Sequence, residues 1–423
     1  MSVSRFERAL DGRIVSCLEW ASEVIASSSD SPAYWQPDDD EAVRPLDKML
    51  SEAALLAMIS QRAIGRHPSI DRLLAAVVGC SESLDRTYEL VRWHPYLWTS
   101  VGAIWVILDE LDVGDPVKRA RLRRLWNDDR APQPRERVPY RLLDQAWIRG
   151  IAQGHQDFSH LGDVVRSSSF AGVTGGIFMA TSDLYAVTHT PMYITDFGRL
   201  GQTEVQPGWM APLGLYRLLL NDLDLAGEFA IADCLTRSPP DTGTVAIAAA
   251  LSSIFDHFGF IPAPTFRNEA FEQTGLSREY LCFHTYHSTF VYGLLCSVLR
   301  ILNVSDVTLT TIMSAHSPRI PCEWNGNRLG MTEVHERVTF TVENWYGLIS
   351  DRGADVDTHQ LLRTVLDAYL LDTVISEKTD EALSLLGMAS YAGPSSVDSS
   401  VRALFAMRGW LGGVEVFADA LPS

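Results

Sequence analysis

Apolar residues recur at intervals of three and four along almost the whole chain, and this spacing most constrains what the chain can fold into. The spacing matches the 3.6 residues per turn of an α-helix and places the apolar side chains on one face. Stretches with strand character are few; the best non-helical candidates are 259–266 and 304–312, and the second could be an irregular or short β segment. The sequence therefore predicts an all-α protein. The predicted helices span residues 13–27, 46–63, 69–92, 98–111, 116–126, 139–153, 176–195, 211–235, 244–257, 277–302, 334–349, 358–375, 380–388 and 398–411.

Short connections between most of these helices favour stacked antiparallel pairs. Several of the longer helices also carry polar groups on faces that otherwise look buried, and a closed ring gives such faces a common central cavity. The predicted architecture is therefore an α/α toroid, with stacked antiparallel helix pairs around that cavity. Polar stretches at 27–45 and 126–139 are predicted to be exposed connections within one large helical domain over 1–423.

The charge balance excludes some classes of partner. The formal net charge is −18 over 423 residues, which would repel nucleic acid and anionic membranes over most of the surface. No window approaches eighteen consecutive apolar residues, and the N-terminus has no apolar core of the secretory kind. We therefore expect a cytoplasmic protein with no nucleic-acid partner and no membrane insertion.

The first segment that could carry chemistry is DLYAVTHTPMYITDFG at 183–198. Helical spacing places Tyr185, His189, Tyr193 and Asp196 in one polar and aromatic stripe. The stripe is either a buried, satisfied network or part of a site. Pro191 lies within the segment, so a kink or break is predicted just after His189, which either aims His189 into a cavity or simply ends the helix.

The second segment is LLLNDLDLAGEFAIADCL at 218–235, in which Asp224 and Glu228 lie one helical turn apart. Like charges at this spacing repel unless a proton, a cation or a basic side chain compensates them. One interpretation is that Asn221 or Asp222 caps a helix and Glu228 is exposed. The other is a carboxylate pair facing a cavity, where one group stays protonated or both bind a cation.

The third segment is REYLCFHTYHSTFVYGLLC at 278–296. His284 and His287 are three residues apart and could chelate a metal from one helix, with Glu228 or Asp196 from another. The alternative is a pair of core histidines that hydrogen-bond to the backbone or to tyrosine.

The fourth segment is DRGADVDTHQLLRTVLDAYLL at 351–371, where Asp355-x-Asp357-Thr358 opens an amphipathic helix. A helix N-terminus by itself explains Asp or Thr at these positions. The stretch also resembles the D-x-D-[DT]-T loop of terpenoid cyclases of the protonating class. That resemblance implies an α/α-barrel and a proton-donating role for Asp357.

A broader resemblance spans residues from about 180 to 295. The stretches LYAVTHTPMYITDFG, DLDLAGE and TYHSTFVYGLL together resemble a group of all-helical bacterial proteins that are often associated with natural-product pathways. This resemblance implies a role in specialised metabolism.

These segments together predict one polar cavity in an apolar helical body. Its acid, base and aromatic groups would suit a cyclase, isomerase or lyase that acts on a small, largely apolar molecule without a cofactor. The predicted catalytic residues are His189, Tyr193, Asp196, Asp224, Glu228, His287 and Asp357.

Two other functions remain open. One is a metal-dependent hydrolase or lyase that holds a divalent metal. Its candidate ligands are His189, Glu228, His284 and His287. The other is a helical binding or scaffold protein that performs no chemistry.

Overall fold

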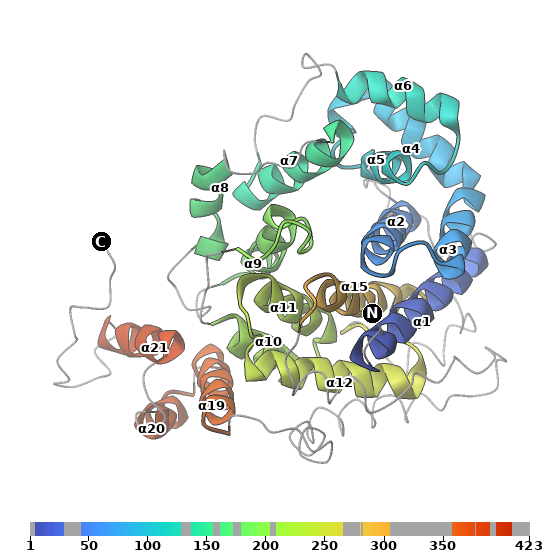
Figure 1. The fold of residues 1–423 in the computed structure, drawn as a ribbon. Helices are drawn as coiled ribbons and strands as arrows, with labels where there is room; N and C mark the ends of the chain where they lie inside the picture. The colour runs from blue at the N-terminus through green and yellow to red at the C-terminus, as the bar shows by residue number, and fades with distance from the viewer. Residues whose placement is uncertain are drawn as a thin grey trace.

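The computed structural model describes residues 5–28, 44–127, 137–154, 161–171, 179–203, 209–264, 280, 282–304, 358–376, 378–389 and 395–407. In this part of the chain the regular structure is entirely helical, with sixteen α-helices, two short 3₁₀ helices and no β-strand (Figure 1), so the predicted all-α class is confirmed. None of these helices combines the length and the apolar character needed to cross a membrane.

The α-helices are α1 (Arg5–Ser28), α2 (Pro45–Ile64), α3 (Pro68–Gly79), α4 (Ser81–Trp93), α5 (Ala103–Glu110), α6 (Pro116–Trp126), α7 (Pro139–Gln153), α8 (Gly162–Arg166), α9 (Thr181–Ile194), α10 (Met210–Leu219), α11 (Leu223–Thr236), α12 (Thr242–Phe258), α15 (Tyr286–Ile301), α19 (Thr358–Ile375), α20 (Thr379–Ala389) and α21 (Ser396–Met407). The 3₁₀ helices are η1 (Pro95–Leu97) and η3 (Ser169–Ala171).

Two predicted helices are each split in two by a short turn. The predicted helix 69–92 is α3 and α4, which meet at Cys80. The predicted helix 211–235 is α10 and α11, separated by a turn in which Asn221 is left-handed with φ of 58°. Apolar spacing does not detect such turns, because the helices on both sides bury residues in one core.

Other predictions fall partly or wholly outside the described residues. The non-helical candidate 259–266 is described up to residue 264, and this part is not helical, as predicted. The described residues do not include the non-helical candidate 304–312 beyond residue 304, the predicted helix 334–349 or most of both predicted connections.

Helix α9 continues through Pro191 to Ile194, so the alternative in which the helix ends after His189 is wrong. Proline removes one backbone hydrogen bond and crowds the preceding turn. Because α9 packs against α7 on one side and α11 on the other, tertiary contacts hold the helix together across the proline. The segment that carries His189 is therefore a single helix.

Six helices follow one another in a closed circuit of packing contacts. In order around the circuit, α2 contacts α5, α5 contacts α7, α7 contacts α9, α9 contacts α11, α11 contacts α15, and α15 returns to α2 (Figure 1). The C-terminal helices lie to one side, where α19 packs against α10 and α12. A full toroid of antiparallel pairs goes further than these contacts and stays a prediction.

Helix α11 is the most deeply buried element of this circuit, since every one of its residues is buried. A helix that is apolar on all sides is typical of a protein interior. At Gly227 the neighbouring helix α15 comes so close that a Cβ atom would lie 2.8 Å from Cγ1 of Val291. Glycine at this position therefore sets the distance between the two central helices.

Asp233 lies near the C-terminal end of α11 and ties it to the next helix. Its carboxylate accepts hydrogen bonds from the backbone N–H of Asp241 at 2.9 Å and the hydroxyl of Thr244 at 2.7 Å. Asp241 in turn caps α12 and accepts a hydrogen bond from Thr364 of α19 at 3.0 Å. Burial raises the pKa of Asp233 to about 6, and the nearby charge of Asp241 adds to the shift.

We expect Gly227→Ala to lower the free energy of unfolding by about 1–3 kcal/mol, because the added methyl group overpacks a stiff, β-branched neighbour. Urea denaturation of the purified chain measures the change. Gly79→Ala is the matched control, since Gly79 ends α3 with open space around it and no loss of stability is expected there. Equal effects of the two substitutions would contradict this account of Gly227.

The Asp233 carboxyl predicts a pH-dependent stability. Its pKa is about 6 in the folded protein against an ordinary value of 3.8, so folding favours the protonated form. The stabilisation is therefore complete below pH 3.8 and is lost as the pH rises through about 6. Relative to Asp233→Asn, the wild-type chain should lose about 2 kcal/mol of stability between pH 4 and pH 7.

Urea denaturation at several pH values measures this difference. Asp71→Asn, at an exposed position of α3, is the control and should follow the wild-type curve. A constant difference between wild type and Asp233→Asn across this range would show that Asp233 does not titrate as described.

Candidate functional site

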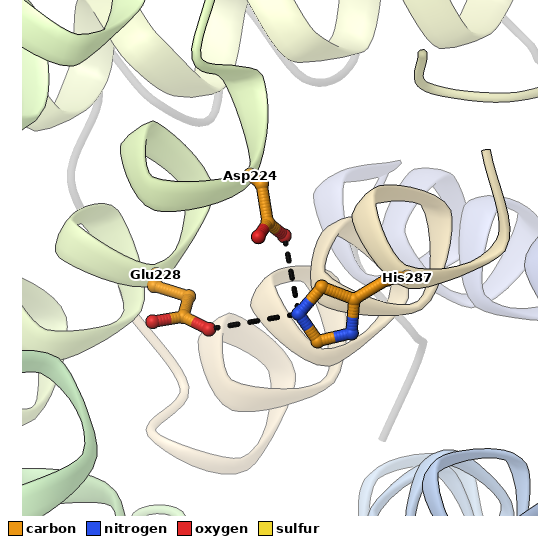
Figure 2. A group of neighbouring side chains, drawn as sticks. All are labelled: Asp224, Glu228 and His287. Atoms are coloured by element: carbon orange, nitrogen blue, oxygen red, sulfur yellow. Dashed lines mark ion pairs between the residues drawn. The ribbon is translucent and has the colours of Figure 1, made fainter. Parts of the chain in front are cut away.

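Asp224, Glu228 and His287 form a compact group between the two central helices (Figure 2). The carboxylates lie one turn apart on α11, and His287 lies in the first turn of α15. His287 Nε2 is 3.4 Å from Asp224 Oδ1 and 3.9 Å from Glu228 Oε1. One potential ligand atom from each residue lies within 4.8 Å of the other two, so the geometry could hold a single cation.

Asp222 caps α11, as one interpretation of the sequence predicted, because its side chain accepts a hydrogen bond from the N–H of Leu225 at 3.3 Å. The same interpretation left Glu228 exposed, and that part is wrong. Glu228 and Asp224 are both buried. The cap and the buried carboxylate pair therefore occur together on one helix.

Glu52 of α2 holds the other side of the His287 ring. Its Oε2 lies 2.8 Å from His287 Nδ1. Since a carboxylate can only accept, Nδ1 carries the proton of that hydrogen bond and Nε2 faces Asp224 and Glu228. The ring is therefore fixed in one orientation between three carboxylates.

His189 of α9 approaches the same group from the opposite side. Its Nδ1 lies 3.6 Å from Glu228 Oε2, and the Thr188 hydroxyl donates to that oxygen at 2.6 Å. His189 Nδ1 also lies 2.9 Å from the backbone carbonyl of Tyr185. Glu228 is thus placed between two histidines from two different helices.

Aromatic rings surround His189. The ring centroids of Tyr185 and Tyr193 lie 5.7 Å and 5.8 Å from that of His189, and the ring of Tyr140 on α7 lies at 6.4 Å. Tyr193 also packs against Trp147 at 5.5 Å. The histidine therefore borders an aromatic environment, whereas the carboxylates border a charged one.

Burial changes the proton affinity of both carboxyl groups. It raises the pKa of Asp224 to about 6 and that of Glu228 to about 7, although the neighbouring His287 opposes both shifts. For Glu52, burial also acts to raise the pKa, but the His287 charge and hydrogen bond outweigh it and the pKa is lowered.

The two histidines shift in opposite directions. Burial lowers the pKa of His189 to about 4, because the opposing charge of Asp144 compensates only part of the desolvation. Burial acts in the same direction on His287, but Glu52 and Asp224 outweigh it and raise its pKa to about 10. At neutral pH the site thus has one neutral and one charged imidazole, a division typical of functional sites.

Asp196 lies away from this group. Helix α9 ends at Ile194, so Asp196 leaves the predicted stripe and adopts a left-handed conformation with φ of 49°. Its fully buried carboxylate pairs with Arg62 at 2.9 Å, accepts a hydrogen bond from Trp147 Nε1 at 2.6 Å and contacts Arg199. These contacts join α2, α7 and the end of α9.

His284 does not share a helical face with His287, because α15 begins at Tyr286 and Thr285 is its N-cap. The ring of His284 lies 4.2 Å from that of Tyr280 and 5.0 Å from that of Phe283. Among the described residues it is not part of the group that could hold a metal, and neither is His189. Asp357 lies outside the described residues.

Sequence reasoning missed Glu52 and Thr188. Glu52 follows Lys48 by four residues and forms an ion pair with it at 3.7 Å, a spacing typical of a solvated helix surface. A threonine next to a histidine gives no signal at all. Neither residue can be recognised before α2 and α9 are placed beside α11 and α15.

We expect Asp196→Asn to lower the free energy of unfolding by about 1.5–3 kcal/mol, because its charged hydrogen bonds to Arg62 and to the buried Trp147 are weakened. Asparagine keeps the shape and tolerates the left-handed conformation. Thermal and urea denaturation measure the effect. Asp163→Asn, which removes an exposed pair with Arg166, is the control and should leave stability unchanged; a similarly small effect at Asp196 would contradict its structural role.

Comparison with known proteins gives one match. Residues 15–297 match the family described as a domain of unknown function, DUF6895, and this range includes every member of the site on α2, α9, α11 and α15. No curated protein and no solved structure matches the chain. Because the match covers more than half of the chain, the protein belongs to the DUF6895 family.

Proposed function

We propose that this chain is an enzyme of the cyclase, isomerase or lyase class, which moves protons on a small, largely apolar molecule. The observation that carries the proposal is the position of His189, beside the buried carboxylate of Glu228 and among tyrosine rings. An imidazole in this setting suits the role of general base.

The hydrogen bonding of His189 supports that role. The backbone carbonyl of Tyr185 can only accept, so the imidazole nitrogen at 2.9 Å, Nδ1, carries the proton. Nε2 then keeps its lone pair, and no described residue forms a hydrogen bond with it. The free lone pair is the feature that a base needs to remove a proton from a substrate.

Glu228 supports the uptake of a proton by His189. When His189 takes a proton, its ring becomes positive, and a carboxylate oxygen 3.6 Å from Nδ1 stabilises that charge. Thr188 keeps this oxygen in place by its hydrogen bond. Glu228 is therefore a positioning residue for the base.

The tyrosine rings indicate the kind of substrate. Their faces offer apolar contact and stabilise positive charge that develops on a carbon skeleton. The circuit of six helices supports the further proposal of an α/α toroid with this site on its inner side. A place in specialised metabolism rests on the sequence resemblance alone.

A second candidate is a metal-dependent hydrolase or lyase. The mutual approach of Asp224, Glu228 and His287 within 4.8 Å favours it. In both candidates the chemistry takes place between α9, α11 and α15.

The test is turnover of small molecules extracted from the source organism. The full chain is incubated with an apolar extract in deuterium oxide, and mass spectrometry follows compounds that disappear or gain deuterium. We expect at least one such compound with wild type, and an at least 100-fold lower rate with His189→Gln, since general base catalysis contributes about 10²–10⁴.

His94→Gln, at an exposed histidine after α4, is the matched control and should keep the wild-type rate. Equal rates for wild type and His189→Gln would overturn the role of His189. A compound that binds to the wild-type chain but is never converted would identify a binding protein instead of an enzyme.

A further inference from the structure

We propose that Asp224, Glu228 and His287 bind one divalent transition-metal cation, and that Glu52 orients His287 for this role. The inference deepens the proposed function and rests on it only in placing the cation beside His189. Its test measures binding alone, so it can fail or succeed independently of any turnover.

The donor atoms fit such a cation. Two carboxylate oxygens and one imidazole nitrogen form a mixed oxygen and nitrogen set, which suits Zn²⁺, Mn²⁺ or Fe²⁺ better than the all-oxygen sets that Ca²⁺ and Mg²⁺ prefer. The three donors come from only two helices, α11 and α15. The close packing of these helices at Gly227 keeps the donors near one another.

The distances between donors are close to those of a coordination sphere. Metal bonds of about 2.0–2.1 Å place two ligands of a tetrahedral site about 3.4 Å apart. His287 Nε2 and Asp224 Oδ1 are separated by 3.4 Å, and Glu228 Oε1 lies 3.9 Å from the same nitrogen. Small side-chain rotations would bring all three donor atoms to the separations of a coordination sphere.

Asp224 gives an independent indication of a ligand. Its Oδ1 atom is buried and has no hydrogen-bond partner among the described residues, and only 10% of the side chain is exposed. Figure 2 shows the carboxylate pointing toward the imidazole of His287. A buried carboxylate oxygen without a hydrogen bond is costly, and a cation would satisfy it.

Glu52 supplies the partner that metal-binding histidines usually have. Such a histidine commonly donates its other ring N–H to a carboxylate, which fixes the tautomer and the ring orientation. Glu52 Oε2 accepts from His287 Nδ1 at 2.8 Å, which leaves Nε2 directed at the two carboxylates. The hydrogen bond thus presents the correct nitrogen to the cation.

The charge of the group also favours a cation. Three carboxyl groups, of Glu52, Asp224 and Glu228, gather around the single charged imidazole of His287, and Lys48, which pairs with Glu52, is 58% exposed. Buried negative charge needs compensation close by. A divalent cation that replaces the Nε2 proton of His287, which is released to solvent, supplies more positive charge at the point where two of the carboxylates converge.

The experiment is a titration of the full chain with Zn²⁺ after dialysis against a chelator. Isothermal calorimetry should give about one site per chain in wild type. Asp224→Asn and His287→Gln should each weaken the affinity at least 10-fold, and Glu52→Gln should weaken it about 10–100-fold through the orientation of His287. Mg²⁺ should bind more weakly than Zn²⁺.

Two control variants test whether Zn²⁺ binds at this group of residues and not elsewhere on the chain. Asp222→Asn changes the neighbouring carboxyl group but keeps a good helix cap, and it should bind Zn²⁺ like wild type. His189→Gln should also keep the cation, because His189 is a base and not a ligand in this assignment. Absence of binding in wild type, or equal binding in Asp224→Asn and His287→Gln, would overturn the proposal.

A measurement on wild type covers the case in which the variants do not fold. Proton NMR of the Co²⁺-substituted chain should give one hyperfine-shifted, exchangeable imidazole N–H signal, from Nδ1 of a single coordinated histidine. No such signal, or signals from two histidines, would contradict the ligand set of Asp224, Glu228 and His287.

Discussion

Complete burial of α11 is the constraint on which the surrounding structure depends. The helix has no exposed residue, yet it carries Asp224, Glu228 and Asp233. Each carboxylate must find a partner inside the protein, because an uncompensated charge in the interior costs several kcal/mol. The neighbouring helices supply these partners, so α9, α12 and α15 must lie within contact distance of the carboxylates.

The two ends of α11 meet this need in different ways. At Asp233 one carboxylate oxygen accepts hydrogen bonds from a backbone N–H and a threonine, and this end joins α11 to α12. At the other end Asp224 keeps an oxygen without a hydrogen bond, although His287 lies 3.4 Å away. Helix α11 thus carries one carboxylate, Asp233, that is satisfied by hydrogen bonds, and a pair, Asp224 and Glu228, that is only partly hydrogen-bonded. This contrast distinguishes the candidate site from polar groups that only stabilise the core.

Much of the fold class followed from residue spacing, because amphipathic helices leave a strong periodic pattern. The pair Asp224 and Glu228 was also recognisable, since two carboxylates in adjacent turns of an apolar helix require compensation. His287 was found as half of a pair whose other half, His284, lies before the start of α15. Periodicity cannot place a helix start to within a residue, and one residue decides which face a side chain occupies.

The rest of the site depends on tertiary placement that no local pattern encodes. Glu52 looks like half of a surface ion pair with Lys48 until α2 lies against α15. The continuation of α9 through Pro191 could not be predicted from the sequence either. Contacts with neighbouring helices stabilise it, and local sequence preference does not. The helices α19 to α21 lie beyond residues 15–297, which match the family, and α19 packs against α10 and α12.

The buried carboxylate of Asp196 has a consequence for how the helices around the candidate site can move. Asp196 joins Arg62 of α2 to Trp147 of α7 at the end of α9, and these helices also carry Glu52, Tyr140 and His189. Separating α2 from α9 at this end would remove Arg62 from a buried carboxylate and leave it with Trp147 and the more exposed Arg199 as partners. The contacts of Asp196 therefore restrict how far α2, α7 and α9 can move apart at this end of the candidate site.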